Sequence, residues 1–205
     1  GDVAVSTIKH YEGEQPLFLK ISFARPHSPY DPPQRILEMY ENIEIPAPAE
    51  GEWSKHIGKD ITDPQADSSA AFAQFSTEYV KNTRKHYYAA VTFIDEQVGR
   101  IVKALKEKGM YDNTIICFTS DHGDMMGDHH SWRKTYAYEG SAAIPMIIKT
   151  PKDVEGVHCR GKVIENPVEL RDILPTFLDA AGVETPEAMD GRSMLKLIKE
   201  ENPQW

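Results

Sequence analysis

Residues 114–124 read TIICFTSDHGD, an apolar run of β-prone side chains that ends abruptly in a carboxylate, an imidazole and a glycine. The run predicts a strand that ends near Ser120. In open α/β sheets ligands bind at the carboxyl ends of the strands, which is where Asp121 and His122 stand. These two residues offer an oxygen and a nitrogen ligand side by side, and Gly123 lets the backbone bend away. The segment therefore predicts a metal or substrate site on an α/β fold.

Two further segments extend the predicted sheet. Residues 17–23 predict a largely buried strand that stops at the proline-rich turn 25–33, and residues 145–149 predict a short strand. A helix is predicted from about residue 70 to residue 108, because apolar side chains recur there at alternating steps of four and three. These side chains are Tyr87, Val91, Ile94, Val98, Ile101 and Leu105. Strand, helix and strand in this order indicate a parallel crossover unit. We therefore expect a three-layer α/β/α sandwich with a mixed, largely parallel sheet.

The C-terminal part of the chain predicts two more helices, over residues 171–182 with Gly182 as the cap, and over residues 192–200. Residues 42–68 are rich in proline, glycine and charge, and predict a long surface excursion, which is more often functional than inert.

Composition limits the function. The 205 residues carry a net charge of −9, which argues against a nucleic acid partner and requires local cations around any anionic substrate. The two cysteines do not suggest a disulfide framework. No apolar stretch approaches the roughly 18 residues of a membrane span, so none is predicted.

Three clusters carry candidate chemistry, and each has a plain structural alternative. Asp121-His122 follows a strand, but an Asp-His-Gly turn can be merely polar. Residues 127–134 crowd imidazoles and cations, as a solvated loop also does. His27 lies between Pro26 and a second proline at position 29, where a histidine alone is more often structural.

Together these clusters indicate an anion pocket. His27 and Asp121 each follow a strand of the predicted parallel sheet, so both are expected at the same edge, with Lys134 on the returning loop. A divalent cation on Asp121 and His122 would neutralise charge as a Lewis acid, and Lys134 would act as a point charge on the non-bridging oxygens. His27 could protonate a leaving alkoxide. Such a pocket fits a tetrahedral oxyanion ester.

At these residues the chain resembles the sulfatase family of the alkaline-phosphatase-like superfamily, and the resemblance extends over nearly the whole chain in the family's order. The matching segments are RPHSPY (25–30), FTSDHGDMMGDH (118–129), Lys134, YEG (138–140), IP (144–145), VELRDILPT (168–176) and DGRS (190–193).

The resemblance implies that Asp121 and His122 ligate the metal, usually calcium, and that Lys134 and His27 contact the sulfate group. It also implies that His27 assists the leaving group. His129 and His130 are at most pocket-lining residues, and His130 is the one expected to contact the substrate. The implied activity is that of a sulfuric ester hydrolase of the arylsulfatase or glycan-sulfatase kind.

The family nucleophile is a formylglycine made within a Cys/Ser-x-Pro/Ala-x-Arg motif, and no such motif occurs here. Cys117 is followed by Phe118 and Thr119, and Cys159 by Arg160 and Gly161. We therefore interpret residues 1–205 as a partial sulfatase catalytic domain, without the N-terminal nucleophile segment and the C-terminal subdomain. The isolated chain is expected to lack turnover, with the formylglycine upstream.

Two alternatives stay open. One is a phosphodiesterase or phosphonate monoester hydrolase of the same superfamily, and the other is a non-catalytic module that binds sulfated glycans. The substrate would be a small-molecule or glycan sulfate ester, with residues 42–68 as the best candidate for specificity. Exposed sheet edges predict self-association. A periplasmic or secreted location follows only by analogy with bacterial sulfatases.

Overall fold

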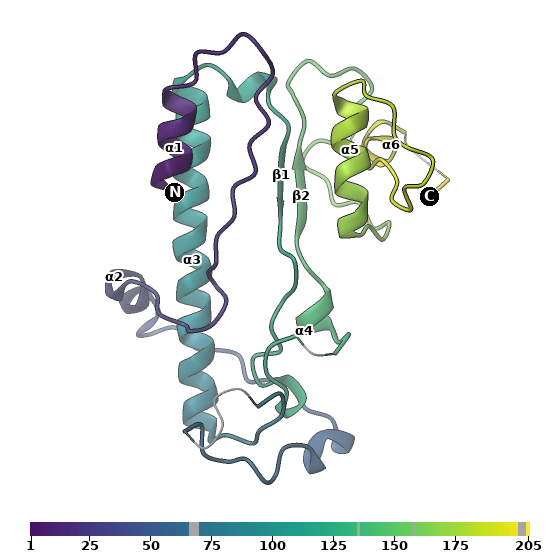
Figure 1. Cartoon of the computed structure of the whole chain (residues 1–205). Coiled ribbons are helices and arrows are strands. Elements are labelled where there is room, and N and C mark those ends of the chain that lie inside the picture. The colour runs from purple at the N-terminus through teal and green to yellow at the C-terminus, as the bar shows by residue number, and fades with distance from the viewer. Residues whose placement is uncertain (66–69, 135, 158, 201–203) are drawn as a thin grey trace. The chain divides into compact units, whose positions relative to one another are not determined.

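The computed structural model describes residues 1–65, 70–134, 136–157, 159–200 and 204–205, and so leaves out part of the 42–68 excursion. The chain, drawn in Figure 1, folds into two compact units. The first contains residues 1–111 and 122–144, and the second contains residues 112–121 and 145–205. Within the described ranges, no helix has the length and apolar character needed to cross a bilayer.

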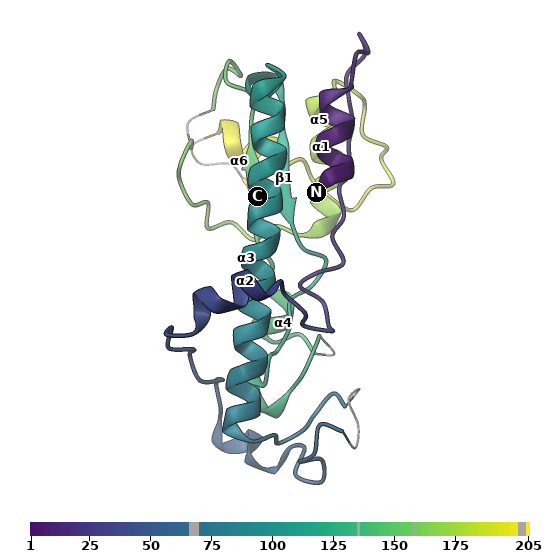
Figure 2. The same ribbon diagram turned by 90° about the vertical axis from the view of Figure 1, so that its left-hand side faces the viewer.

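The first unit is built along one long helix, α3 (Thr77–Glu107), which confirms the helix predicted from periodicity but begins about seven residues later than predicted. Its first turn is capped by Ser76, whose hydroxyl accepts a hydrogen bond from the Tyr79 N–H at 3.2 Å. Helix α1 (Asp2–Lys9), which the sequence did not predict, lies along the C-terminal half of α3 (Figures 1 and 2).

Helix α1 buries Ala4 and Ile8. The α3 side chains that are buried are not quite the predicted stripe: Ile94 and Leu105 are buried, but Val91 is exposed and Gln97 is buried instead. The side chains of α3 that are buried are decided by the elements that pack on this helix, namely α1, α2 (Gln34–Leu37) and η1 (Glu38–Tyr40). The spacing of apolar residues along α3 does not reveal where these elements lie.

A small core at the N-terminal end of α3 holds the loop that follows the DHG motif. Val80 of α3 packs with Ala73 and Trp132, and the Trp132 indole donates a hydrogen bond to the Ala73 carbonyl at 3.2 Å. Three short helical turns also belong to the first unit, η2 (Glu52–His56), η4 (Asp128–His130) and α4 (Glu139–Ala142), and η2 contacts η4. The loop is thereby anchored to residues far away in the sequence.

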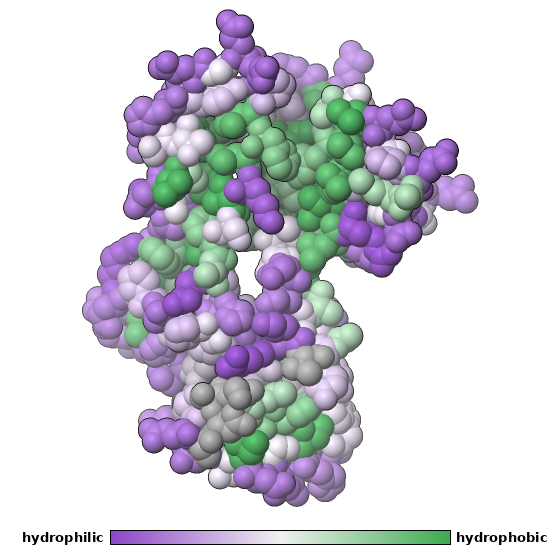
Figure 3. Space-filling view, viewed as in Figure 1, coloured by the Kyte–Doolittle hydropathy of each residue, from purple (hydrophilic) through white to green (hydrophobic). Residues whose placement is uncertain are grey.

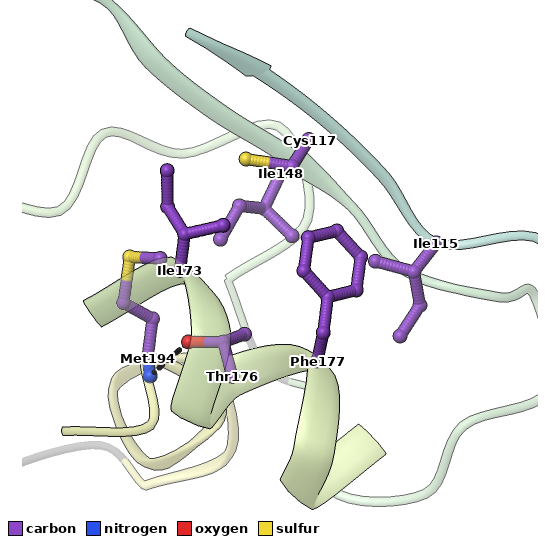
Figure 4. A pocket seen from close by; sticks show the side chains of 7 residues that line it. All are labelled: Ile115, Cys117, Ile148, Ile173, Thr176, Phe177 and Met194. Atoms are coloured by element: carbon purple, nitrogen blue, oxygen red, sulfur yellow. Dashed lines mark hydrogen bonds between the residues drawn. The ribbon is translucent and has the colours of Figure 1, made fainter. Parts of the chain in front are cut away.

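The second unit contains the only two strands in the described residues, β1 (Ile116–Thr119) and β2 (Met146–Lys149), both at predicted positions. They pair antiparallel, with Cys117 opposite Ile148. Helices η5 (Leu170–Asp172), α5 (Ile173–Ala180) and α6 (Leu195–Lys199) follow, as the sequence predicted for α5 and α6. Figure 4 shows the apolar side chains that meet between the strands and α5: Ile115, Cys117, Ile148, Ile173, Phe177 and Met194.

The other face of the two strands is exposed. Side chains alternate between the faces of a strand, so Phe118 and its partner Ile147 point away from α5. Ile147 is 60% exposed and Phe118 37% exposed. Figure 3 shows apolar side chains gathered over β2 and α5 of this unit.

The prediction of a buried strand over residues 17–23 is wrong. These residues have no regular secondary structure, and Phe18 is 73% exposed. An apolar run becomes a strand only where another strand supplies its hydrogen-bond partners, and the run itself does not encode that partner. Accordingly, the parallel crossover unit does not form in the described residues, whose sheet is antiparallel.

Candidate functional site

The turn that carries His27 is closed by an ion pair. The Arg25 guanidinium donates a hydrogen bond to the Asp31 carboxylate at 2.8 Å, which ties the two ends of the proline-rich turn together. The guanidinium keeps the pKa of the Asp31 carboxyl below its ordinary value. Inside this turn, His27 Nδ1 lies 2.9 Å from the Ser28 carbonyl oxygen. Because a carbonyl only accepts, Nδ1 carries the proton and Nε2 presents a lone pair.

Two residues that are distant in the sequence contact His27. His122 follows it by 95 residues and Lys134 by 107 residues. The Lys134 ammonium lies 3.0 Å from His27 Nε2, close enough to donate a hydrogen bond to it. The rings of His27 and His122 meet edge to face, with centroids 5.9 Å apart. Three of the predicted site residues therefore lie together in the first unit.

His122 has the same tautomer as His27, because its Nδ1 lies 2.7 Å from the Gly123 carbonyl oxygen. Histidines that ligate metals usually donate the other ring N–H to a carbonyl in this way, so His122 Nε2 suits a metal ion. Asp121 precedes it directly and is exposed. In the described part of the chain, no group of three His, Cys, Asp or Glu side chains is placed to hold a metal. His122 therefore suits a metal site by its tautomer, and Asp121, which ends the 112–121 segment of the second unit, stays a predicted ligand.

Gly123 is required by a close approach. A Cβ atom at this position would stand 2.2 Å from the Gly140 carbonyl oxygen, and the Gly123 N–H donates to the Ser141 carbonyl at 2.8 Å. The motif glycine thus lets the start of α4 pack directly against the residues that follow His122.

Asp124 joins the two segments that supply the site, a role that the sequence analysis missed. Its carboxylate accepts hydrogen bonds from the Tyr30 hydroxyl at 2.8 Å, the Arg133 N–H at 2.9 Å and the Met126 N–H at 3.0 Å. Tyr30 is three residues from His27, and Arg133 is next to Lys134. Burial, followed by the Asp124 charge, raises the pKa of Tyr30 well above its ordinary value, so the hydroxyl stays a donor. The one signal in the sequence for the contact between Tyr30 and Asp124 is that Tyr30 belongs to the proline-rich turn that carries His27.

The loop between Asp124 and Lys134 contains four non-glycine residues with positive φ, a conformation that costs free energy. The angles are 50° at Met126, 53° at His129, 58° at His130 and 67° at Arg133. Arg84 of α3 supports the loop by donating to the Met126 carbonyl and to the Asp128 carboxylate, both at 3.1 Å. Such strain persists only where surrounding contacts hold it, and it is concentrated at functional sites.

His130 is not brought to the anion site by any contact of its side chain in the described residues. Its backbone bonds to Gly127 and Ala73. The neighbouring His129 makes the side-chain contacts instead, with Trp53 at 4.8 Å and Tyr138 at 5.4 Å between ring centroids. Adjacent residues point in different directions, and sequence alone does not say which of the two faces inward.

Comparison with known proteins identifies the family of the chain. A model of the sulfatase family matches residues 2–183. The chain belongs to the sulfatase family. An arylsulfatase from Clostridium perfringens is 40% identical over 203 residues, which are 98% of this chain and 41% of that protein. A choline-sulfatase from Rhizobium meliloti is 33% identical over 195 residues, 91% of this chain and 36% of the relative.

Among solved structures, a phosphonate monoester hydrolase from Silicibacter pomeroyi matches this sulfatase-family chain with a TM-score of 0.80 and 31% identity. The match covers 99% of this chain and 42% of that one. The chain therefore has part of the alkaline-phosphatase-like α/β fold, as predicted. It spans about two fifths of the length of these proteins. Members of the family use a metal ion and a formylglycine.

Proposed function

We propose that this sulfatase-family chain carries the sulfate-binding half of a sulfuric ester hydrolase. The observation that carries the proposal is the 3.0 Å contact between Lys134 Nζ and His27 Nε2, with His122 beside His27. These groups come from two distant segments and leave cationic and imidazole nitrogen atoms in one place on a protein with a net charge of −9. Such a local concentration of donors is what an anionic ester requires on an acidic protein.

Each residue has a distinct role in the proposal. Lys134 donates to the non-bridging oxygens and offsets the charge that develops on the sulfuryl group. His27, held at Nδ1 by the Ser28 carbonyl, presents Nε2 toward the ester and, once protonated, hydrogen-bonds the bridging oxygen and delivers a proton to the leaving alkoxide. The neighbouring ammonium orients this nitrogen before substrate arrives. His130 remains only a candidate for substrate contact.

Asp121 and His122 would hold the divalent cation of the family, which supplies Lewis-acid stabilisation of the ester when bound. Calcium is the ion that the sulfatase resemblance implies. However, calcium and manganese prefer oxygen ligands, whereas an imidazole nitrogen suits zinc. Calorimetric titration of the chain with each ion, against the Asp121→Asn variant, distinguishes these cases without relying on activity.

The nucleophile is a separate matter, because the formylglycine motif does not occur in these 205 residues. We infer that residues 1–205 are a partial catalytic domain and that the formylglycine lies in polypeptide outside them. The chain alone is therefore expected to show no metal-dependent, saturable hydrolysis of a chromogenic sulfate ester. Turnover at the rate of a complete sulfatase would contradict this inference.

The sulfate site itself is tested by binding. Phenyl sulfate should bind the chain with an affinity that falls about tenfold or more in the Lys134→Ala variant, because one charge-assisted contact is lost. Lys81→Ala, which removes an exposed lysine of α3, serves as the matched control and should leave the affinity unchanged. Equal affinities for wild type and Lys134→Ala would refute the proposed site.

A second candidate is phosphonate monoester hydrolysis, favoured by the match to the Silicibacter pomeroyi enzyme. Tetrahedral phosphorus and sulfur oxyanions present similar charges to Lys134 and His27. The relative affinities of the chain for phenyl sulfate and a phenyl phosphonate monoester, measured under the same conditions, decide between the two.

A further inference from the structure

Three aromatic rings from distant segments form a cluster in the first unit: Trp53 of η2, His129 of η4 and Tyr138 at the start of α4. The indole and phenol rings stack at an interplanar angle of 20°, with centroids 5.8 Å apart. The imidazole contacts both of them. We refer to these three residues as the aromatic cluster.

The cluster is built and held by specific contacts. The His129 N–H donates to the Ala49 carbonyl at 2.7 Å, and the Ala49 N–H donates to the Asp128 carboxylate at 2.9 Å. A Cβ atom at Gly51 would stand 2.6 Å from the indole Nε1 of Trp53, so the ring lies against the backbone. These contacts join the 42–68 excursion to the loop that carries Lys134.

Two observations set the cluster apart from ordinary core packing. Trp53 is 50% exposed and Tyr138 is 37% exposed, so aromatic surface faces solvent. In addition, His129 Nδ1 is buried without a hydrogen-bond partner, and the residue is held at a φ of 53°. A strained backbone and an unpaired buried nitrogen both cost free energy, and such costs are concentrated at functional sites.

The cluster also lies within reach of the sulfate site. His129 precedes Lys134 by five residues and Tyr138 follows it by four. Since consecutive Cα atoms are about 3.8 Å apart, the Cα atom of Tyr138 lies within about 15 Å of that of Lys134. This is an upper limit between Cα atoms, and both side chains extend from them, so an ester with one or two rings needs to span only the remaining distance.

We infer that the aromatic cluster binds the alcohol part of the ester as an uncharged ring, an aryl group or the apolar face of a sugar. This inference rests on the proposed sulfate site. Flat rings stack on exposed Trp and Tyr at little entropic cost. Glu52 is neutralised by Lys55 at 2.6 Å, so Glu139, which follows Tyr138 in the sequence, is the charge that disfavours a second anionic group there.

The test compares two ligands by calorimetry on the 205-residue chain: phenyl sulfate, which has a ring, and methyl sulfate, which has none. Wild type should bind phenyl sulfate about tenfold more tightly, and Trp53→Ala should reduce this preference to about twofold or less. Trp53→Phe keeps a ring and should retain most of the preference. Tyr136→Ala is the matched control, since Tyr136 is also exposed but packs on Phe72.

The outcomes separate the two proposals. A preference that survives in Trp53→Ala, while Lys134→Ala weakens both ligands, overturns the aromatic cluster and leaves the sulfate site standing. Affinities that do not respond to Lys134→Ala, or no binding of either ligand, overturn both. Choline sulfate bound more tightly than phenyl sulfate in a Trp53-dependent way would overturn the assignment to an uncharged ring.

Discussion

Removal of the Asp124 carboxylate should destabilise the first unit more than any other single exposed or half-buried substitution near the site. The carboxylate is the common acceptor for the Tyr30 hydroxyl and for the backbone N–H groups of Met126 and Arg133. Asp124→Ala leaves these three donors without their acceptor. At about 1–3 kcal/mol for each unsatisfied buried group, and with partial access to water, the loss should be about 3–5 kcal/mol.

Two milder variants divide this loss. Tyr30→Phe removes one hydrogen bond to a charged acceptor and leaves the two backbone contacts, so about 1.5 kcal/mol is expected. Asp124→Asn keeps an oxygen for the backbone N–H groups, and the tyrosine hydroxyl can turn to accept from the amide, so about 1 kcal/mol is expected. Tyr87→Phe is the control, because Tyr87 contacts the Tyr30 ring at 5.8 Å and makes no hydrogen bond to Asp124 in the described residues.

The assay is urea unfolding followed by both circular dichroism and tryptophan fluorescence, whose transitions must coincide before free energies are compared. A double-mutant cycle of Tyr30→Phe with Asp124→Asn should give a coupling energy of about 1 kcal/mol. If Asp124→Ala costs less than about 1 kcal/mol, or no more than Tyr87→Phe, then Asp124 does not hold the two site segments together and the reasoning fails.

Three further predictions follow from the packing. Trp132→Ala should cost about 3–5 kcal/mol, since the buried indole fills the core beside Val80 and bonds to Ala73, and urea unfolding should show it. Burial raises the pKa of the Cys117 thiol, so the folded state resists ionisation and stability should fall as the pH rises through the ordinary thiol pKa. Cys117→Ala should remove this alkaline decline, which thermal unfolding between about pH 7 and 10 measures. Ile147→Lys should reduce any concentration-dependent self-association seen by analytical ultracentrifugation, because it places a charge on the exposed sheet face, and unchanged association would exclude that face.

Local patterns determined much of this protein. The apolar run before Asp121 predicted β1, the three-and-four spacing predicted α3, and the short run after Pro145 predicted β2. The family motifs named His27, His122 and Lys134, which the structure places together. These features are encoded by neighbouring residues, so a sequence suffices to recognise them.

Tertiary structure decided the features that require contacts between segments distant in the sequence. Residues 17–23 are apolar enough for a strand but lie outside the described sheet, because strand formation requires a neighbour that the run cannot specify. In the sequence, nothing distinguishes Asp124 from other loop carboxylates. Its role is seen only in the structure, where the hydroxyl of Tyr30, 94 residues away, donates a hydrogen bond to it. Likewise, only the structure shows that His129, and not its neighbour His130, contacts the Trp53 ring. Hydrogen bonds and ring contacts between distant segments depend on how the chain folds back on itself, which no local pattern records.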